Sequence, residues 1–408
     1  MLSLHQGDQL RRIPYTPALF VGRDATARVV DAVRDVRRTA SAKALVFRGA
    51  RGSGKTWFAL NLHCCTLGET FDEQVNSFYI SLEDSDDQPR AAACNPRIFY
   101  LFNDSDADDG PLDWRLRRML VHIYPHLGVA TASTASLREL DEWVSRRFGT
   151  PAYQNARLTR VFFIDGAFEV DRDLLRLLER HLLSHLLTLP CTLIVIMGRG
   201  REYQWRNGLL RQSDHVYELS PFSIDEMHAQ IYRLNLNGLA PASLEQLHVY
   251  GGGVPLSTSV LARFGVSVTS LDALVDLLLG ARNADLRPFF EALAPLDGFM
   301  EEAIEYLLLD NDPLSGRERW RRAREIRQQL VNTQLVTWDQ KDGVWRMDEA
   351  LRCPLERWLY EASLHRWLRV HQKMRSYYLS WAKETDEYRT YFEARARYHA
   401  DRLDHMDG

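Results

Sequence analysis

A glycine-rich loop, Gly49–Thr56, lies between an apolar run and a helical stretch and restricts the choice of fold more than any other segment. Its eight residues, Gly-Ala-Arg-Gly-Ser-Gly-Lys-Thr, have the spacing of a phosphate-binding loop. The glycines let the backbone curl so that its N–H groups converge on phosphate oxygens, and the following helix directs its positive end at the same anion. Such a loop requires a buried strand before it and a helix after it.

Two side chains of this loop have defined roles in nucleotide chemistry. Lys55 reaches the β- and γ-phosphates, and the Thr56 hydroxyl is a ligand for Mg²⁺. Lys55 is the only lysine between Lys43 and Lys341, in a chain whose basic residues are nearly all Arg. A compact ammonium fits between phosphates where a planar guanidinium fits badly. The loop therefore predicts binding of ATP or ADP together with Mg²⁺.

The sequence around the loop alternates between strand and helix patterns. Short apolar runs without polar alternation are typical of a parallel sheet covered on both faces, and they lie at Ala44–Phe47, Phe78–Leu82, Val161–Ile164, Leu193–Met197 and Val216–Leu219. Stretches with apolar residues at i, i+3 and i+4 predict helices at Asp24–Arg38, Gly54–Leu62, Leu112–Ile123, Ser136–Phe148 and Asp171–Leu187. This alternation predicts an α/β fold with a parallel sheet. With 45% hydrophobic and 26% charged residues, the chain lies outside the disordered class.

Two further strand ends carry residues suited to nucleotide hydrolysis. Asp165 follows Val161–Ile164 and supplies the second carboxylate that the Mg²⁺ shell of a P-loop fold requires. Many P-loop ATPases have a water-activating Glu directly after this Asp; here Gly166 stands there, so we assign that role to Glu169. Arg199 follows the next apolar run and is predicted to sense the γ-phosphate through charge-assisted hydrogen bonds. The candidate catalytic residues are Lys55, Asp165, Glu169 and Arg199.

After about residue 219 the strand pattern stops and helices follow. Pro255 stands at the first position of one of them, where proline is favoured. Farther on, two helices, a third at Gly316–Leu330 and a hairpin across the turn Lys341–Gly343 have the layout of a winged helix. The expected domains are an arm at 1–18, a P-loop core at 19–222, a helical domain at 223–283, a winged-helix domain at 284–350 and C-terminal helices at 351–408.

The helix Gly316–Leu330 is rich in arginine and has two functional interpretations. Arg317, Arg321 and Arg324 share one face, as they would in a winged helix whose third helix enters the DNA major groove. Against this, the chain has 51 basic and 55 acidic residues, so its overall field gives little attraction for a polyanion. We expect this helix to serve protein contacts, and DNA binding is the alternative.

Taken in their order along the chain, these motifs resemble the STAND class of signal-transducing P-loop ATPases, the NACHT and NB-ARC group. The resemblance runs from about Leu19 to about Leu359. Phe20–Asp24 is similar to the motif that borders the adenine, and Val161–Glu169 is similar to the NACHT acidic motif, with Phe168 where an acid is usual. The resemblance implies nucleotide contacts from Val21, Gly22, Arg23, Gly49, Gly52, Ser53, Gly54, Lys55, Thr56, Trp57 and Pro255.

One motif departs from the pattern of the family. Met347–Leu351 looks like the element in which a His of STAND proteins binds the ADP β-phosphate and locks the inactive state. Asp348 stands at the position of that His, and a carboxylate would repel a phosphate. We therefore do not expect this contact to hold ADP here.

The predicted function is an ATP-binding molecular switch with slow hydrolysis, whose nucleotide state controls assembly with itself or with partner proteins. The resemblance implies prokaryotic signalling or defence, with the effector and sensor of STAND proteins supplied in trans. The first alternative is an AAA+ ATPase of the origin-recognition type that binds DNA through the winged helix; the missing Glu after Asp165 counts against it. The second is a nucleotide-dependent scaffold without turnover.

Four observations bear on location and metal content. The chain has no run of about 18 uncharged apolar residues, and its first twelve residues lack the apolar core of a signal peptide. The five cysteines form no Cys-x-x-Cys, and His181 and His185, one helical turn apart, belong to no recognisable metal-binding motif. We expect a cytoplasmic protein with reduced thiols, no zinc and no membrane association.

Overall fold

The computed structural model describes residues 16–22, 24–71, 75–82, 97–101, 111–154, 158–199, 203–211, 216–235, 241–310, 313–386 and 388–404. The chain divides into two compact units, Met1–Asn235 and Leu236–Gly408, each of which is described by itself. Within the described ranges, no helix combines the length and the apolarity that crossing a membrane requires.

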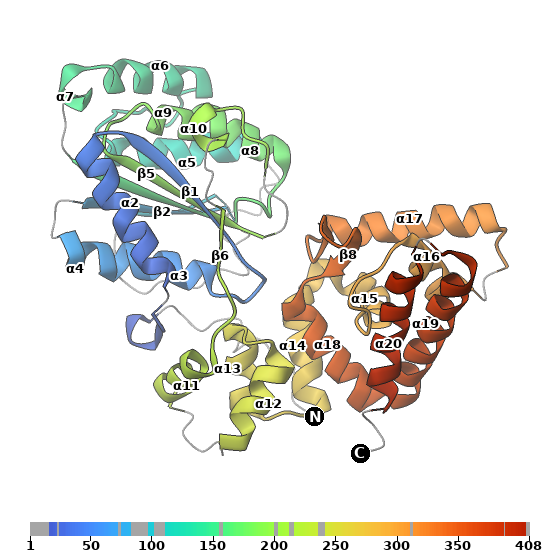
Figure 1. Cartoon of the computed structure of the whole chain (residues 1–408). Helices are drawn as coiled ribbons and strands as arrows, with labels where there is room; N and C mark the ends of the chain where they lie inside the picture. Colours follow the sequence, from blue (N-terminus) through green and yellow to red (C-terminus); the bar gives the residue numbers. More distant parts are fainter. Residues whose placement is uncertain are drawn as a thin grey trace. The chain divides into compact units, whose positions relative to one another are not determined.

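The first unit is built on a parallel sheet (Figure 1). Its described strands lie in the order β3-β2-β4-β5-β1-β6, and all neighbours run parallel. The strands are β1 (Ala42–Arg48), β2 (Val75–Ser81), β3 (Ile98–Tyr100), β4 (Thr159–Asp165), β5 (Thr192–Gly198) and β6 (Val216–Glu218). The central strands β4 and β5 are buried along their whole length, as burial on both faces requires. The predicted α/β class is confirmed.

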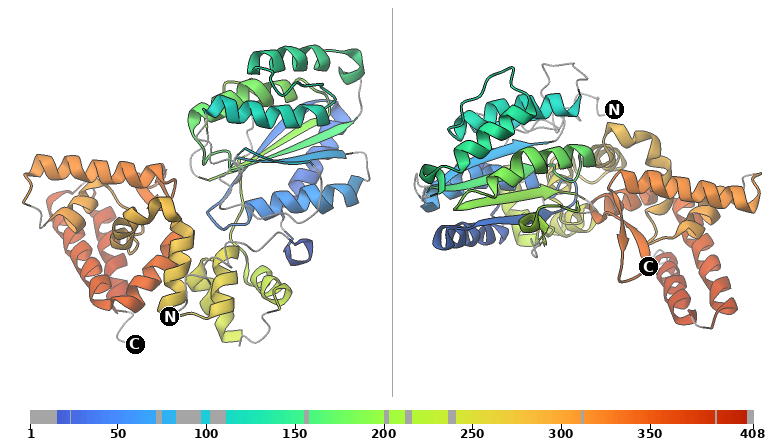
Figure 2. Two further views of the ribbon diagram at one scale, coloured as in Figure 1. Left: turned by 180° about the vertical axis from the view of Figure 1, so that it is seen from behind. Right: turned by 90° about the horizontal axis from the view of Figure 1, so that it is seen from above.

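Helices cover both faces of this sheet (Figures 1 and 2). Phe163 of β4 packs in the core beneath α2 (Ala25–Thr39) and α3 (Lys55–Asn61). Its neighbour Phe162 packs in the opposite core, which α5 (Leu112–His126), α6 (Leu137–Phe148) and α8 (Arg172–Leu178) cover, because side chains of a strand alternate between faces. The remaining elements are η1 (Pro17–Leu19), η2 (Leu62–Thr66), α4 (Leu67–Phe71), α7 (Pro151–Gln154), η5 (Glu179–Leu183), α9 (Ser184–Leu186), α10 (Gly208–Arg211) and α11 (Ile224–Arg233).

In the second unit, the secondary structure of the described residues is helical apart from one hairpin. Its helix α13 begins at Pro255, as the sequence predicts. In chain order the elements are α12 (Pro241–Gly251), α13 (Pro255–Phe264), α14 (Val268–Leu279), η6 (Ala281–Leu286), α15 (Arg287–Leu293), α16 (Glu301–Ile304), η7 (Glu305–Leu309), α17 (Gly316–Asn332), β7 (Val336–Asp339), β8 (Val344–Met347), α18 (Glu349–Ala362), α19 (Leu364–Glu384) and α20 (Arg389–Asp404).

The segment from α15 to β8 has the winged-helix arrangement of three helices and a hairpin. β7 and β8 pair antiparallel, with Trp338 opposite Trp345, and Phe299 forms a bridge to Trp345 through two backbone hydrogen bonds of 2.9 Å. Ala323, Ile326 and Leu330 bury the inner face of α17. Trp320, which helical spacing places in the same apolar stripe, is instead 38% exposed, because the buried stripe begins one turn later.

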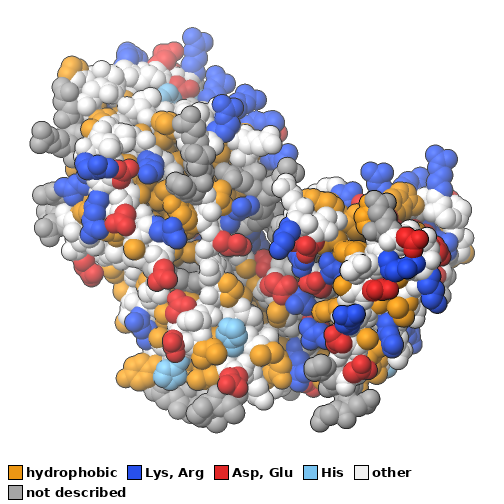
Figure 3. Space-filling model, in the orientation of Figure 1, with side chains coloured by type: hydrophobic (Ala, Val, Ile, Leu, Met, Phe, Trp, Pro, Cys, Tyr) orange, Lys and Arg blue, Asp and Glu red, His pale blue; other side chains and the backbone are white. Residues whose placement is uncertain are grey.

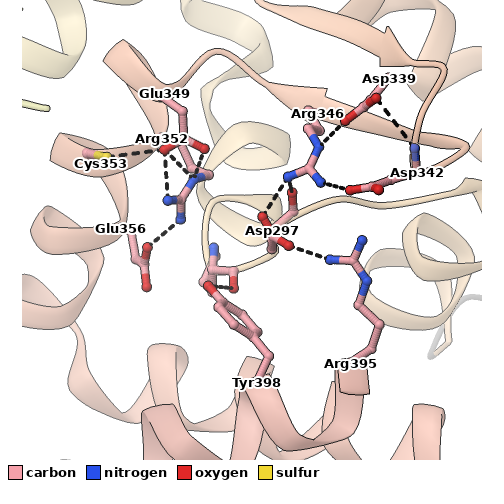
Figure 4. Close-up of polar contacts among 11 residues, drawn as sticks. Asp297, Asp339, Asp342, Arg346, Glu349, Arg352, Cys353, Glu356, Arg395 and Tyr398 are labelled. Atoms are coloured by element: carbon pink, nitrogen blue, oxygen red, sulfur yellow. Dashed lines mark hydrogen bonds and ion pairs between the residues drawn. The ribbon is translucent and has the colours of Figure 1, made fainter. Parts of the chain in front are cut away.

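Charged side chains join the hairpin to the last helix (Figure 4). Arg346 of β8 donates to Asp297 at 2.7 Å and to Asp339 at 2.7 Å, and it also pairs with Asp342. The other oxygen of the Asp297 carboxylate accepts a hydrogen bond from Arg395 of α20 at 2.6 Å. Asp297 therefore connects the hairpin and α20 within the second unit.

Asp348, at the position of the STAND histidine, has a local structural role. Its side chain accepts a hydrogen bond from the backbone N–H of Ala350 at 3.0 Å, so it caps the N-terminus of α18. Aspartate is among the favoured residues at this position because it satisfies an N–H group that lacks a partner within the helix.

Candidate functional site

The loop Gly49–Thr56 joins the end of β1 to the start of α3. Gly52 and Gly54 have φ angles of 77° and 88°. At such positive φ angles the backbone of a residue other than glycine is strained. A Cβ atom at Gly49 would lie 2.6 Å from Ser53 Oγ and 3.3 Å from Leu219 Cβ, so a side chain there would require Ser53 to move. These glycines allow the curled backbone that a phosphate-binding loop needs.

Lys55 is enclosed by its own loop. Its side chain is buried, and Nζ donates to the carbonyl oxygens of Gly49 at 2.9 Å and of Ala50 at 3.0 Å. A phosphate at this position would offer the ammonium charged oxygens, and charge-assisted hydrogen bonds are roughly twice as strong as neutral ones. The ammonium is therefore already positioned at the loop, held by groups that a phosphate can replace.

Asp165, the last residue of β4, is the point where three segments meet. Its Oδ2 accepts hydrogen bonds from Thr56 Oγ1 at 2.6 Å and from the Tyr79 hydroxyl at 2.7 Å, and its Oδ1 accepts from the Gly166 N–H at 3.1 Å. Burial, with a smaller contribution from the charge of Glu169, raises the pKa of Asp165 above its usual value, although the hydrogen bonds from Thr56 and Tyr79 and the charge of Lys55 act in the opposite direction. Thr56, Tyr79 and Lys55 thus offset part of the effect of burial, because each of them favours the carboxylate form.

Thr56 and Asp165 form a donor pair that fits Mg²⁺. Hydroxyl and carboxylate oxygens are the hard ligands that Mg²⁺ prefers, and it commonly takes one or two of them together with substrate phosphates and water. Thr56 donates its single proton to Asp165, so its oxygen lone pairs face elsewhere and suit a cation. Among the described residues, no cluster of three or more His, Cys, Asp or Glu is placed to hold a metal.

The turn after Asp165 packs against the end of β5. The Ala167 N–H donates to the Met197 carbonyl at 2.8 Å, and a Cβ at Gly198 would lie 2.6 Å from the ring of Phe168. Phe168 is buried by this contact. The position where the resemblance expects an acid is therefore a core position in this chain.

The two catalytic candidates at the ends of β4 and β5 contact each other. Arg199 donates to Glu169 at 2.9 Å, and their side chains are only 16% and 8% exposed. From the sequence, Glu169 is predicted to activate the attacking water and Arg199 to bind the γ-phosphate. In the structure each residue orients the other.

The other predicted contact residues are placed as follows. Val21 is buried, Gly22 is exposed and Trp57 is half-buried in the first turn of α3. Pro255 belongs to the second unit and begins α13. Arg23 lies outside the described residues.

Sequence reasoning missed Tyr79 and one cluster away from the loop. A tyrosine inside a buried strand needs a partner for its hydroxyl, and that requirement was the available signal. Asp141 of α6 lies 2.8 Å from His181 Nδ1 and 3.1 Å from His185 Nε2, so the two histidines share a carboxylate from a separate helix. The sequence identified no such partner because it lies 40 residues before His181.

Comparisons with known proteins find similar solved structures but identify no family for this chain. No family model and no curated protein matches the chain. Solved structures similar to it include Drosophila ORC bound to DNA (12% identity, 87% of this chain and 90% of that chain, TM-score 0.42) and the Aeropyrum pernix ORC1 protein in complex with DNA (13%, 87% and 96%, 0.40). Cdc6p from Pyrobaculum aerophilum is also similar (15%, 87% and 98%, 0.34). The STAND class that the motifs resemble is not confirmed by these comparisons.

Proposed function

We propose that the first unit binds ATP with Mg²⁺ and hydrolyses it slowly. The observation that carries the proposal is the 2.6 Å hydrogen bond from Thr56 to Asp165. It brings two oxygen atoms that can bind a metal ion, from distant segments of the chain, next to the buried Lys55. A bound Mg²⁺ would neutralise the β- and γ-phosphate oxygens as charge develops. Lys55 would bind the same phosphates, and Gly52 and Gly54 would let the backbone N–H groups reach them.

Glu169 and Arg199 are proposed to act on the attacking water and on the γ-phosphate, respectively. Glu169 would orient the attacking water, and Arg199 would bind the γ-phosphate. Because these side chains bind each other at 2.9 Å, each must loosen this contact to reach its target. Breaking a largely buried ion pair is unfavourable, which accounts for slow hydrolysis in this proposal.

The same contact suggests how nucleotide identity is read. The γ-phosphate of ATP is an anion that competes with Glu169 for Arg199, whereas ADP offers no such group. We propose that this difference makes the protein a switch, whose ATP state assembles with itself or with a partner protein acting in trans. The ligand must favour one state by several kcal/mol to move most of the population.

Equilibrium binding of a fluorescent ATP analogue, with and without Mg²⁺, tests nucleotide binding. Lys55→Ala removes a charged donor to phosphate, worth about 2–3 kcal/mol, so binding should weaken at least about 30-fold. Lys43→Ala is the matched control, because Lys43 lies at the other end of β1 and pairs with Asp35 at 3.3 Å. Unchanged affinity in Lys55→Ala, or an equal loss in both variants, would refute the assignment.

The surface of α17 favours a second candidate function, DNA binding by an ATPase of the origin-recognition type. Arg317, Arg321 and Arg324 are exposed on this helix, and basic side chains stand along it in Figure 3. α17 is the third helix of the winged-helix arrangement, which is the helix that enters the major groove in DNA-binding proteins of this kind.

Four ion pairs weigh against DNA as the ligand of this surface. Glu325 lies 3.1 Å from Arg322 and 3.9 Å from Arg321, so part of the positive charge is compensated. In the hairpin, Arg346 is surrounded by carboxylates, including Asp339 and Asp342 of the wing. We therefore place DNA binding second.

Duplex binding measured across salt concentrations separates the two functions. DNA binding through α17 would give a log–log slope near −0.9 for each phosphate neutralised, and Arg321→Ala with Arg324→Ala would lower that slope by about two phosphates. Arg138→Ala is the control, since Arg138 is an exposed arginine on α6 of the first unit. Salt-steep binding that is lost in the double variant and kept in the control would make DNA binding the leading function.

A further inference from the structure

We infer that Tyr79 is a positioning residue for the metal site, because its hydroxyl holds the Asp165 carboxylate in the orientation that receives Mg²⁺ beside Thr56. The inference rests on the proposed function, since it takes Thr56 and Asp165 as the Mg²⁺ ligands. Tyr79 belongs neither to the phosphate-binding loop nor to the strand that ends in Asp165; it comes from the neighbouring strand β2.

The strand register explains how Tyr79 reaches the site. Tyr79 lies opposite Phe163 in the pairing of β2 with β4, and Ser81 lies opposite Asp165. Tyr79 is therefore two residues short of Asp165, about 6.6 Å along the strand, a distance that a tyrosine side chain spans. Phe163 and Asp165 point to the same face of the sheet, and Tyr79 packs in the core of that face together with Phe163.

Packing fixes the ring of Tyr79. The residue is 2% exposed, and its core also contains Phe47, Phe58 and Val161. Protein cores are close-packed, so the ring cannot swing without displacing its neighbours. The hydroxyl is thus held at 2.7 Å from Asp165 Oδ2 by the core of the unit.

The carboxylate is oriented by donors from three separate segments. Thr56 and Tyr79 donate to Oδ2, and the Gly166 N–H donates to Oδ1. Thr56 and the loop must adjust when phosphate and cation enter, whereas Tyr79 remains in the core. The Tyr79 hydrogen bond is therefore the one that keeps Asp165 oriented while its other surroundings change.

Tyr79→Phe keeps the ring and removes only the donated proton. The measurement is the Mg²⁺ concentration that gives half-maximal binding of a fluorescent ATP analogue, together with the affinity of the analogue in EDTA. The half-saturating Mg²⁺ concentration should rise on the order of tenfold, the usual scale for one hydrogen bond to a charged group. The affinity in EDTA should change less than about twofold, since no phosphate contact is lost.

Tyr124→Phe is the matched control. Tyr124 is a fully buried tyrosine of the same unit, and its hydroxyl donates to the His181 carbonyl in the core on the opposite face of the sheet. This variant loses a comparable hydrogen bond away from the loop, so its melting temperature should fall while its Mg²⁺ requirement stays that of the wild type.

The outcomes distinguish this inference from the proposed function. A Tyr79→Phe protein with the wild-type Mg²⁺ requirement, or a shift that Tyr124→Phe reproduces, would overturn the positioning role and leave nucleotide binding intact. A wild-type protein whose binding ignores Mg²⁺, or an Asp165→Asn variant with full Mg²⁺ dependence, would overturn the proposed function itself.

Discussion

The Glu169–Arg199 ion pair can be tested in the nucleotide-free protein. Arg199→Ala removes the cation from a carboxylate that is only 8% exposed. Removal of one partner of a buried pair destabilises a protein by about 3–5 kcal/mol, and the 16% exposure of Arg199 places the expected value near the lower end, about 3 kcal/mol. Glu169→Gln keeps an acceptor for Arg199 and should destabilise by about 1–2 kcal/mol. The double variant should show a coupling energy of about 1–2 kcal/mol.

Hydrogen exchange of peptides from β4 and β5 gives the free energy of unfolding for the first unit alone. A local measurement is needed because two units do not necessarily unfold together, and one melting curve would mix them. Arg176→Ala is the control, since Arg176 pairs with Asp173 on the exposed side of α8 and should contribute less than about 1 kcal/mol. A coupling energy below about 0.5 kcal/mol would refute the ion pair, and with it our account of slow hydrolysis.

Two further predictions concern the second unit. Asp348→Ala should destabilise α18 by about 1 kcal/mol through loss of its N-cap, and hydrogen exchange in the first turn of α18 should become faster. The affinity for ADP should stay unchanged. A loss of ADP affinity without a change in hydrogen exchange would instead show that Asp348 contacts the nucleotide, as the histidine does in STAND proteins. Burial lowers the pKa of His399 to about 4, and His371, 2.8 Å away, is also held below its usual pKa by burial. The unfolded chain therefore takes up protons on both histidines below about pH 6.5 while the folded unit does not, so stability should fall by about 4 kcal/mol between pH 7.5 and pH 5, about 2 kcal/mol for each histidine. Hydrogen exchange of α19 and α20 at both pH values measures this, and a pH-independent result, or an undiminished dependence in His399→Gln, would contradict it.

Much of the fold was predictable because its signals are local. The run at Val161–Ile164 is apolar at each position, and a strand buried on both faces needs no partner information to be recognised. The same holds for the loop Gly49–Thr56, whose backbone conformation depends on its own glycines. The hairpin around Lys341–Gly343 was also found from its turn residues. Strand β3 (Ile98–Tyr100) was missed, although β6, which is equally short, was predicted, so a strand this short is not reliably recognised from its own residues.

The candidate site was predictable only as far as each residue acts alone. Asp165 and Thr56 were assigned from their own motifs, whereas Tyr79 became visible only when the register of β2 against β4 was known. Glu169 and Arg199 were assigned separate roles because a sequence does not show that the ends of β4 and β5 bring them to 2.9 Å. These are tertiary contacts between residues 30 to 109 positions apart, for which neither spacing nor composition carries a signal.

Asp297 determines which parts of the second unit depend on each other. Its carboxylate accepts hydrogen bonds from Arg346 of the hairpin and from Arg395 of α20, which lie 49 and 98 positions away in the chain (Figure 4). A fragment that stops before α20 would lose Arg395 and leave Arg346 as the one described cation paired with Asp297, Asp339 and Asp342, so we expect the hairpin to be less stable in such a fragment. A change in the position of α20 would therefore reach Arg346 of the hairpin through the carboxylate of Asp297.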